Sequence, residues 1–314
     1  MAPVAAPRSS RVTALEHRSD PNRIASVVDP SRNEASCAKL GFVPRVETSD
    51  GVVLEVRDDG RGRPVLLLHG FPDSSYVWRK QIGPLVEAGF RVVTPDLRGF
   101  GASDKPQDLD AYRLTTLLAD VIVMLDALGV ERADVVGHDW GAVLAWLVAG
   151  LHADRVDRLV AMSVGHPNTQ AELSVEQREK SWYMRWFQFQ GLAEEILPRG
   201  GWRLLREWTR GNGDVKRYVR ELAQPGALTA GLNWYRANLS PLRELQPRRE
   251  FPKISAPTMG MWSSGDDYLL EAPVKRSGEQ VTGGWRYERI DGASHWPQLD
   301  APDRVNDLLV DFLG

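Results

Sequence analysis

The residues best suited to chemistry lie in the segment Val135–Gly141, whose sequence is VVGHDWG. Gly137 and Gly141 flank Asp139 with the spacing of a nucleophile elbow, a tight strand-to-helix turn in which two glycines surround the reactive residue. An apolar run precedes this segment and a helical pattern follows it. Because a carboxylate is ionised at neutral pH without a helping base, we interpret Asp139 as a nucleophile rather than as a simple helix cap.

An acid and a histidine follow the elbow in the chain order that such a site requires. Asp266 comes after the apolar run Thr258–Trp262, and His295 comes after the next such run. Ligands of parallel α/β sheets bind beyond the carboxyl ends of the strands, so we expect these side chains to lie beside Asp139. The neighbouring Asp267 is the alternative acid.

A loop after another apolar run adds backbone donors to this site. The segment His69–Arg79 reads HGFPDSSYVWR and can supply the backbone N–H of Phe71. With the backbone N–H of Trp140, it would form an oxyanion hole. We expect the side chains of Phe71 and Trp140 to line the substrate pocket, and we interpret His69 and His138 as loop support.

These residues need elements that bring them to one edge of a sheet. Apolar runs alternate with helical patterns along much of the chain, and this alternation predicts an α/β fold with a mostly parallel sheet covered by helices on both faces. The expected strands are 42–48, 52–57, 64–69, 90–95, 133–137, 156–164, 258–262 and 285–290. The expected helices are 76–88, 112–128, 142–152 and 301–313.

The alternation stops near residue 167 and resumes near residue 251. We therefore assign residues 41–167 and 251–314 to one core, and residues 168–250, which are helical in character and rich in Trp and Arg, to an inserted helical lid. Residues 1–40 are rich in Ala, Pro, Arg and Ser, and we expect a loosely ordered lead-in there.

The motifs together resemble those of one enzyme group. HGFP, DLRGFGASD, GHDWG and GASHW stand in the order found in the epoxide hydrolase branch of the α/β-hydrolase superfamily, and the resemblance covers about residues 41–314. It implies the α/β-hydrolase fold and two lid tyrosines that hydrogen-bond the epoxide oxygen. Tyr183 in SWYMRWFQ and Tyr235 in GLNWYRAN fall on the corresponding segments. Aromatic lid packing is the alternative role for both tyrosines.

The resemblance also implies a reaction and its participants. Asp139 would attack a small apolar epoxide and form an ester, and Tyr183 and Tyr235 would protonate the opened oxygen. His295, oriented by Asp266, would then activate water to hydrolyse the ester and release a vicinal diol. No metal or organic cofactor is expected for this chemistry.

Two rival functions use the same scaffold. A haloalkane dehalogenase has the same nucleophile but needs N–H donors for the halide, commonly the Trp after the nucleophile together with an Asn in the first loop or a lid Trp. Trp140 is present, but Phe71 occupies the Asn position. A non-catalytic small-ligand-binding protein could share the fold, although a complete triad argues against that function.

Composition limits the possible partners and location. The formal net charge is -3 and the pI is about 6.1, so no basic face for nucleic acid is indicated. The longest apolar run, Leu114–Val130, contains two Asp residues at helical spacing, and we therefore expect no membrane segment. We expect a cytoplasmic protein, which could be a monomer or a homodimer.

Overall fold

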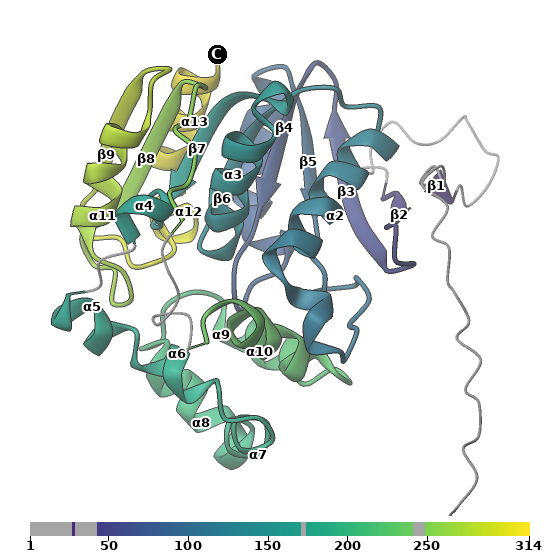
Figure 1. Ribbon diagram of the computed structural model, residues 1–314, viewed down its shortest axis with the longest axis vertical. Coiled ribbons are helices and arrows are strands. Elements are labelled where there is room, and N and C mark those ends of the chain that lie inside the picture. Colours follow the sequence, from purple (N-terminus) through teal and green to yellow (C-terminus); the bar gives the residue numbers. More distant parts are fainter. Residues whose placement is uncertain (1–26, 29–42, 171–173, 241–248) are drawn as a thin grey trace, which may run out of the picture.

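A single twisted sheet forms the centre of the molecule (Figure 1). The computed structural model describes residues 27–28, 43–170, 174–240 and 249–314. Within these ranges the sheet has nine strands in the order β1-β2-β3-β5-β4-β6-β7-β8-β9. The strands are β1 (Val27–Val28), β2 (Arg45–Glu47), β3 (Val53–Gly60), β4 (Arg63–Leu68), β5 (Phe90–Pro95), β6 (Ala133–His138), β7 (Val156–Met162), β8 (Thr258–Ser263) and β9 (Trp285–Ile290). Strands β1, β2 and β3 are antiparallel to their neighbours, and the others pair in parallel.

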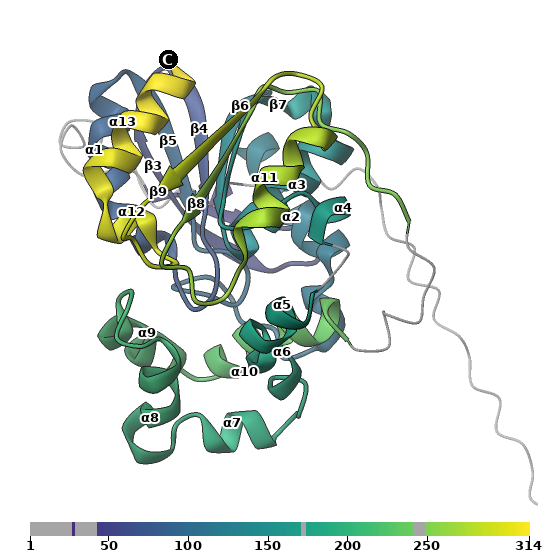
Figure 2. The same cartoon turned by 90° about the vertical axis from the view of Figure 1, so that its left-hand side faces the viewer.

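Helices cover both faces of this sheet. Figure 2 shows α1, α12 and α13 on one face and α2, α3 and α11 on the other. The helices of the α/β part are α1 (Arg79–Glu87), α2 (Leu114–Ala127), α3 (Trp140–Leu151), α11 (Glu271–Arg276), α12 (Pro297–Asp300) and α13 (Pro302–Leu313), with 3-10 turns η1 (Ser75–Trp78), η2 (Leu109–Tyr112), η3 (Ala153–Arg155) and η5 (Ser277–Gln280). The expected α/β-hydrolase architecture, a mostly parallel sheet between two helical layers, is therefore confirmed.

The burial of the central strands explains their sequences. Every residue of β6 and β8 is buried, as are the last four residues of β4 and of β7. Strands covered by helices on both sides lose the apolar–polar alternation and become continuous apolar runs. Edge strand β9 is less buried, and five of its six residues, WRYER, keep partial or full exposure.

A second group of helices lies beyond the carboxyl ends of the parallel strands (Figure 1). These helices are α5 (Val175–Lys180), α6 (Trp182–Trp186), α7 (Leu192–Ile196), α8 (Arg199–Trp208), α9 (Val215–Leu222) and α10 (Ala227–Asn238). The short helix α4 (Pro167–Gln170) instead lies beside α11 of the α/β part (Figure 1). Helix α10 is the most firmly attached to the core, because Trp234 Nε1 donates to the carbonyl of Arg98 at 3.0 Å and Asn238 Nδ2 donates to the carbonyl of Tyr112 at 2.7 Å.

The sequence-based boundaries agree with these elements apart from local differences. The expected helix 76–88 begins as the 3-10 turn η1, and the expected helix 142–152 begins at Trp140, directly after Asp139. Strand β1 pairs with β2 inside the expected lead-in, at a place where we expected no element. The rest of residues 1–40 lies outside the described ranges. Among the described residues, none of the helices is long and apolar enough to cross a bilayer.

Candidate active site

The turn between β6 and α3 holds Asp139 in an unusual backbone conformation. Its φ is 53° and its ψ is -121°, a region that L residues rarely adopt. A Cβ atom at Gly137 would lie 2.2 Å from the carbonyl oxygen of Gly141, and one at Gly141 would lie 2.0 Å from that of Leu68. Only glycine fits at these two positions. The two glycines that flank Asp139 in the sequence are therefore required because backbone segments pack directly against the turn.

Two groups contact the carboxylate of Asp139. The backbone N–H of Phe71 donates to Oδ1 at 2.9 Å, and Nε2 of His295 lies 3.7 Å from Oδ2. Burial alone would raise the pKa of Asp139, but the nearby positive charge of His295 opposes this rise and holds the pKa below its usual value. Asp139 is therefore an anion with one oxygen held by the backbone.

The structure distinguishes the two candidate acids. Asp266 Oδ2 lies 2.8 Å from Nδ1 of His295, and its Oδ1 accepts hydrogen bonds from two backbone N–H groups of the same loop, at 2.8 and 3.0 Å. Asp267 instead forms an ion pair with Arg210 at 2.8 Å. Only Asp266 is placed to orient His295, and its other oxygen is fixed by the loop.

His295 is buried between the two carboxylates. Although burial by itself lowers the pKa of an imidazole, the charges of Asp266 and Asp139 raise the pKa of His295 to about 10. Rings surround the imidazole: the centroids of Tyr268 and Trp296 lie 5.1 Å away, and that of His138 lies 4.6 Å away. The resting site is thus an ion pair between Asp139 and protonated His295.

The two expected lid tyrosines reach the same site from α6 and α10. Tyr183 and Tyr235 are 3% and 2% exposed, and their ring centroids are 6.0 Å apart. Burial raises the pKa of both hydroxyls well above the usual value, and the negative charge of Asp139 adds to the rise. The nearby indole of Trp140 opposes this rise at Tyr235. Both tyrosines therefore remain protonated, which is the state required of a donor.

Aromatic side chains of the α/β part and of helices α6 and α10 pack together around Tyr235. The ring of Phe71 lies 5.4 Å from that of Tyr235, and the ring of Trp140 lies 5.2 Å from it. Phe187 completes this wall at 5.1 Å from Tyr235. Trp140 is also the first residue of α3, where helical N–H groups lack intrahelical partners. Phe71 and Trp140 therefore lie beside Asp139 and Tyr235, and their expected roles remain predictions.

Both flanking histidines have structural contacts. His69 Nε2 accepts a hydrogen bond from the backbone N–H of Leu97 at 3.0 Å, and its Nδ1 lies 2.9 Å from the carbonyl oxygen of Gly70. His138 Nε2 lies 2.7 Å from the carbonyl oxygen of His295, and burial lowers the pKa of His138 to about 3. A neutral His138 donates to that oxygen and connects the elbow to the loop of His295.

The sequence analysis did not identify two further residues near the site. Asp73 is buried, accepts a hydrogen bond from the Trp296 indole at 2.9 Å, and has a pKa raised to about 7 chiefly by burial. Tyr268 packs on both Tyr183 and His295. Asp73 stands in the HGFPD segment and could have been noticed there, whereas no sequence pattern points to Tyr268. Within the described ranges, no group of three His, Cys, Asp or Glu side chains could hold a metal ion.

Comparisons with known proteins agree with this geometry. The family model described as the alpha/beta hydrolase fold matches residues 63–302. Epoxide hydrolase A of Mycobacterium tuberculosis is 36% identical over 312 residues, covering 86% of this chain and 96% of the relative. Epoxide hydrolase 3 of Xenopus tropicalis is 35% identical over 271 residues, covering 81% and 72%. The crystal structure of Bacillus megaterium epoxide hydrolase with an inhibitor superposes with a TM-score of 0.77 at 30% identity, covering 84% and 98%.

Proposed function

The chain belongs to the alpha/beta hydrolase fold family, within its epoxide hydrolase branch, and we propose that it converts an epoxide and water into a vicinal diol through an ester on Asp139. The observation that carries this proposal is a buried aromatic cluster in which two protonated tyrosines, Tyr183 and Tyr235, lie close enough to ionised Asp139 for its charge to raise their pKa values. In this proposal, helices α5 to α10 act as the lid that supplies both tyrosines and excludes water from the first step.

The first step is alkylation of the nucleophile. Oδ1 of Asp139 is held by the Phe71 N–H, so Oδ2 is the oxygen that attacks an epoxide carbon. The new C–Oδ2 bond forms as the epoxide C–O bond breaks, and the electron pair moves to the epoxide oxygen. Tyr183 and Tyr235 hydrogen-bond that oxygen, and one of them transfers its proton. The transfer proceeds although burial raises the tyrosine pKa values, because an alkoxide is a far stronger base than a phenolate.

The second step is hydrolysis of the ester. Alkylation removes the negative charge of Asp139, so the pKa of protonated His295 falls. His295 gives its proton to the tyrosine phenolate left by the first step and becomes a neutral base. It takes a proton from water, and the hydroxide attacks Cγ of Asp139. The oxyanion develops on Oδ1, where the Phe71 N–H already donates and the Trp140 N–H can join it. The Cγ–Oδ2 bond then breaks. Oδ2 leaves as a hydroxyl of the diol after taking the proton of the attacking hydroxide, and this transfer restores the Asp139 carboxylate beside protonated His295.

The position of the Trp140 indole favours an epoxide over a haloalkane. A dehalogenase would need this N–H for the departing halide, whereas here the indole packs edge-on against the ring of Tyr235, with the ring centroids 5.2 Å apart. Tyr235 is in turn a donor suited to an oxygen leaving group. The aromatic walls formed by Phe71 and Phe187 indicate a small apolar substrate.

Single turnover in oxygen-18 water tests the proposal. Excess enzyme is mixed with styrene oxide and, separately, with 1-chlorobutane. We expect unlabelled diol in the first turnover and a gain of one oxygen-18 in the peptide that contains Asp139, because water attacks Cγ rather than the substrate. His295→Gln should accumulate the ester as a mass adduct on the same peptide. Label in the first-turnover diol would refute the covalent route, and chloride release without epoxide turnover would refute the epoxide assignment.

A further inference from the structure

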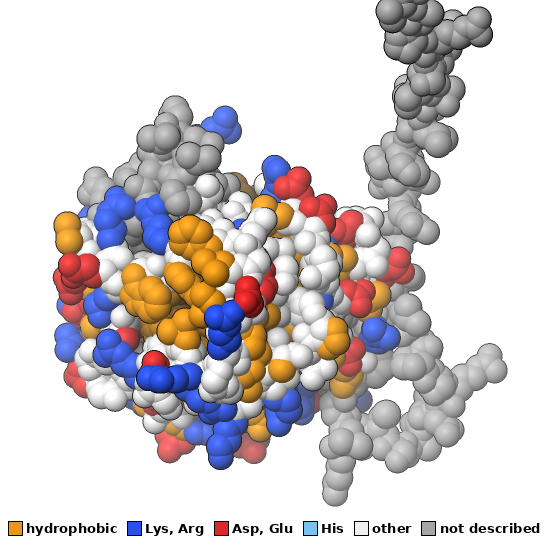
Figure 3. Space-filling model, turned by 90° about the horizontal axis from the view of Figure 1, so that it is seen from below, with side chains coloured by type: hydrophobic (Ala, Val, Ile, Leu, Met, Phe, Trp, Pro, Cys, Tyr) orange, Lys and Arg blue, Asp and Glu red, His pale blue; other side chains and the backbone are white. Residues whose placement is uncertain are grey.

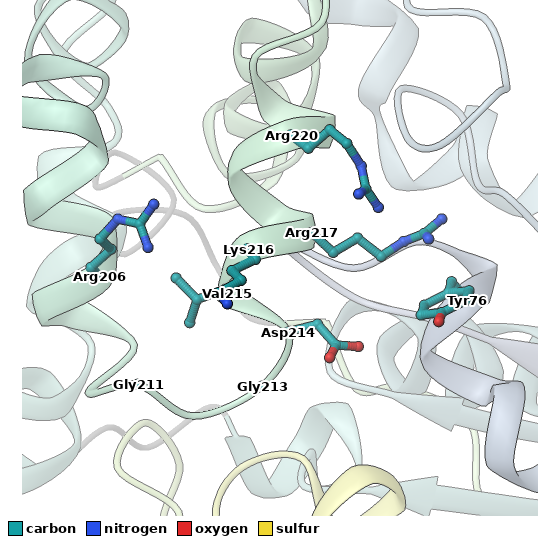
Figure 4. Close-up of a pocket in the computed structure, with 9 residues that line it drawn as sticks. All are labelled: Tyr76, Arg206, Gly211, Gly213, Asp214, Val215, Lys216, Arg217 and Arg220. Carbon is teal, nitrogen blue, oxygen red and sulfur yellow. The ribbon is translucent and has the colours of Figure 1, made fainter.

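A basic pocket lies between helices α8 and α9 and Tyr76 of the core, and none of its lining residues takes part in the proposed reaction (Figure 4). Its volume is about 530 Å³. Arg206 of α8 and Lys216, Arg217 and Arg220 of α9 line it, and Tyr76 of η1 forms the core side. Two helices that are joined by a glycine-containing loop therefore direct four cationic side chains toward one hollow.

Three of these four cations have no acidic partner. In the part of the chain that the structure describes, no ion pair reaches Arg206, Lys216 or Arg220. The cations on the outer side of α8 differ: Arg199 pairs with Glu195, and Arg203 pairs with Glu207 at 2.7 Å. Unpaired positive charge on α8 and α9 is thus concentrated at the pocket.

The other charges of the pocket are already neutralised. Asp214, the acid in its lining, forms an ion pair with Arg79 at 2.7 Å, and Arg217 pairs with Glu221 at 2.6 Å. The chain as a whole has a net charge of -3, whereas residues 174–240 contain eleven Lys and Arg against seven Asp and Glu. Figure 3, a view from the lid side, shows many of these basic side chains around a group of hydrophobic ones. An anion approaching the lid therefore meets a positive field that leads to unpaired cations.

The loop between α8 and α9 keeps the pocket open. Gly211 and Gly213 have φ values of 76° and 68°, and neither places a side chain in the hollow. A Cβ atom at Gly213 would lie 2.5 Å from the hydroxyl of Tyr218 and 3.1 Å from the ring of Trp296. Gly213 therefore lies directly against buried side chains, and a larger residue there would displace the loop.

We propose that this pocket binds a phosphate group, either as free phosphate or pyrophosphate or as the headgroup of an anionic lipid. The guanidinium groups of Arg206 and Arg220 are planar donors that match phosphate oxygens, and Lys216 adds a compact charge. The bound anion would connect α8 and α9. Helix α9 already contacts the core where the guanidinium group of Arg217 stacks on Tyr76, 3.8 Å from its centroid, beside Arg79 of α1 at 4.4 Å.

The test is titration calorimetry of the full chain with pyrophosphate, with inorganic phosphate in parallel, at constant ionic strength. We expect saturable binding that weakens about five- to tenfold with each of Arg206→Gln, Lys216→Gln and Arg220→Gln. The matched control is Arg203→Gln, which removes the same charge from α8 outside the pocket and should leave the affinity within about twofold. Circular dichroism checks that each variant is folded.

A vesicle arm distinguishes the two sources of phosphate. Sedimentation with phosphatidylglycerol vesicles is compared with phosphatidylcholine vesicles, with and without pyrophosphate. Anionic-vesicle binding that depends on Arg206 and Arg220, without pyrophosphate binding, assigns the site to a lipid headgroup. Pyrophosphate binding without vesicle binding assigns it to a free anion. Absence of both, or equal losses in the Arg203→Gln control, would overturn the proposal, because the effect would then be general surface charge.

Discussion

Asp139→Asn should lower the pKa of His295, and the size of the change follows from the structure. The substitution keeps the shape of the side chain but removes its charge, which reproduces the charge state of the proposed ester. The charged Oδ2 lies 3.7 Å from Nε2 of His295. Two unit charges at that separation interact by about 4 kcal/mol at an effective dielectric constant of about 20. This energy corresponds to a pKa change of about three units.

The direction of the shift matters for the mechanism. In the resting site the pKa of His295 is raised to about 10, so the imidazole keeps its proton at neutral pH and stabilises ionised Asp139. Without the charge of Asp139 the pKa falls toward neutrality, and the imidazole can accept a proton from water. His295 would thus become a base only after the nucleophile has been consumed.

Nitrogen-15 NMR of the imidazole, recorded as a function of pH, measures this shift. We expect the His295 signals of the wild-type protein to remain those of an imidazolium through pH 8, and those of Asp139→Asn to titrate about three units lower. Asp267→Asn is the control, since it removes a carboxylate that pairs with Arg210 instead. Intact mass must show that the new amide persists. Equal His295 pKa values in wild type and Asp139→Asn would refute the reasoning.

Three further predictions concern the tyrosines, the acid and the elbow. Tyr183→Phe and Tyr235→Phe should each slow ester formation by about 10- to 100-fold in single-turnover mixing, with little effect on ester hydrolysis. Asp266→Asn should reduce kcat by about 100-fold or more, since His295 loses its orienting group, while Asp267→Asn should stay within about twofold of wild type in steady-state assays. Gly141→Ala should lower the free energy of unfolding by about 3 kcal/mol in denaturant titrations, because its Cβ would lie 2.0 Å from a carbonyl oxygen of β4.

Each of these has an outcome that contradicts it. Equal effects of the tyrosine substitutions on both half-reactions would mean that the hydroxyls only shape the pocket. Comparable losses in Asp266→Asn and Asp267→Asn would remove the distinction between the two acids. If Gly141→Ala were as stable as wild type, the elbow would tolerate a Cβ and the reason for its glycine would be wrong.

Local chain chemistry was enough to predict the core of this fold. A strand buried on both faces must be apolar throughout, and β6 and β8 were visible in the sequence for that reason. The elbow was visible because Gly137 and Gly141 sit where a Cβ would meet backbone atoms. Strand β1 has two residues and helix α12 has four, which is too few to show the hydrophobic periodicity from which a strand or a helix is predicted.

Other features depend on distances between residues far apart in the chain. Asp266 and Asp267 are adjacent and chemically identical, and only the packing of their loop directs one toward His295 and the other toward Arg210. Tyr268 and the buried Asp73 are identified as site residues only by their contacts, with His295 and with the Trp296 indole respectively. The basic pocket is likewise lined by Tyr76 together with side chains from residues 206–220, more than a hundred positions later in the chain.

The residue types and their spacing were therefore enough to predict which groups could react, because a tight turn or a buried strand accepts only certain residues at each position. Which groups meet depended on long-range packing, because side-chain direction and charge pairing are set by neighbours that no local pattern records.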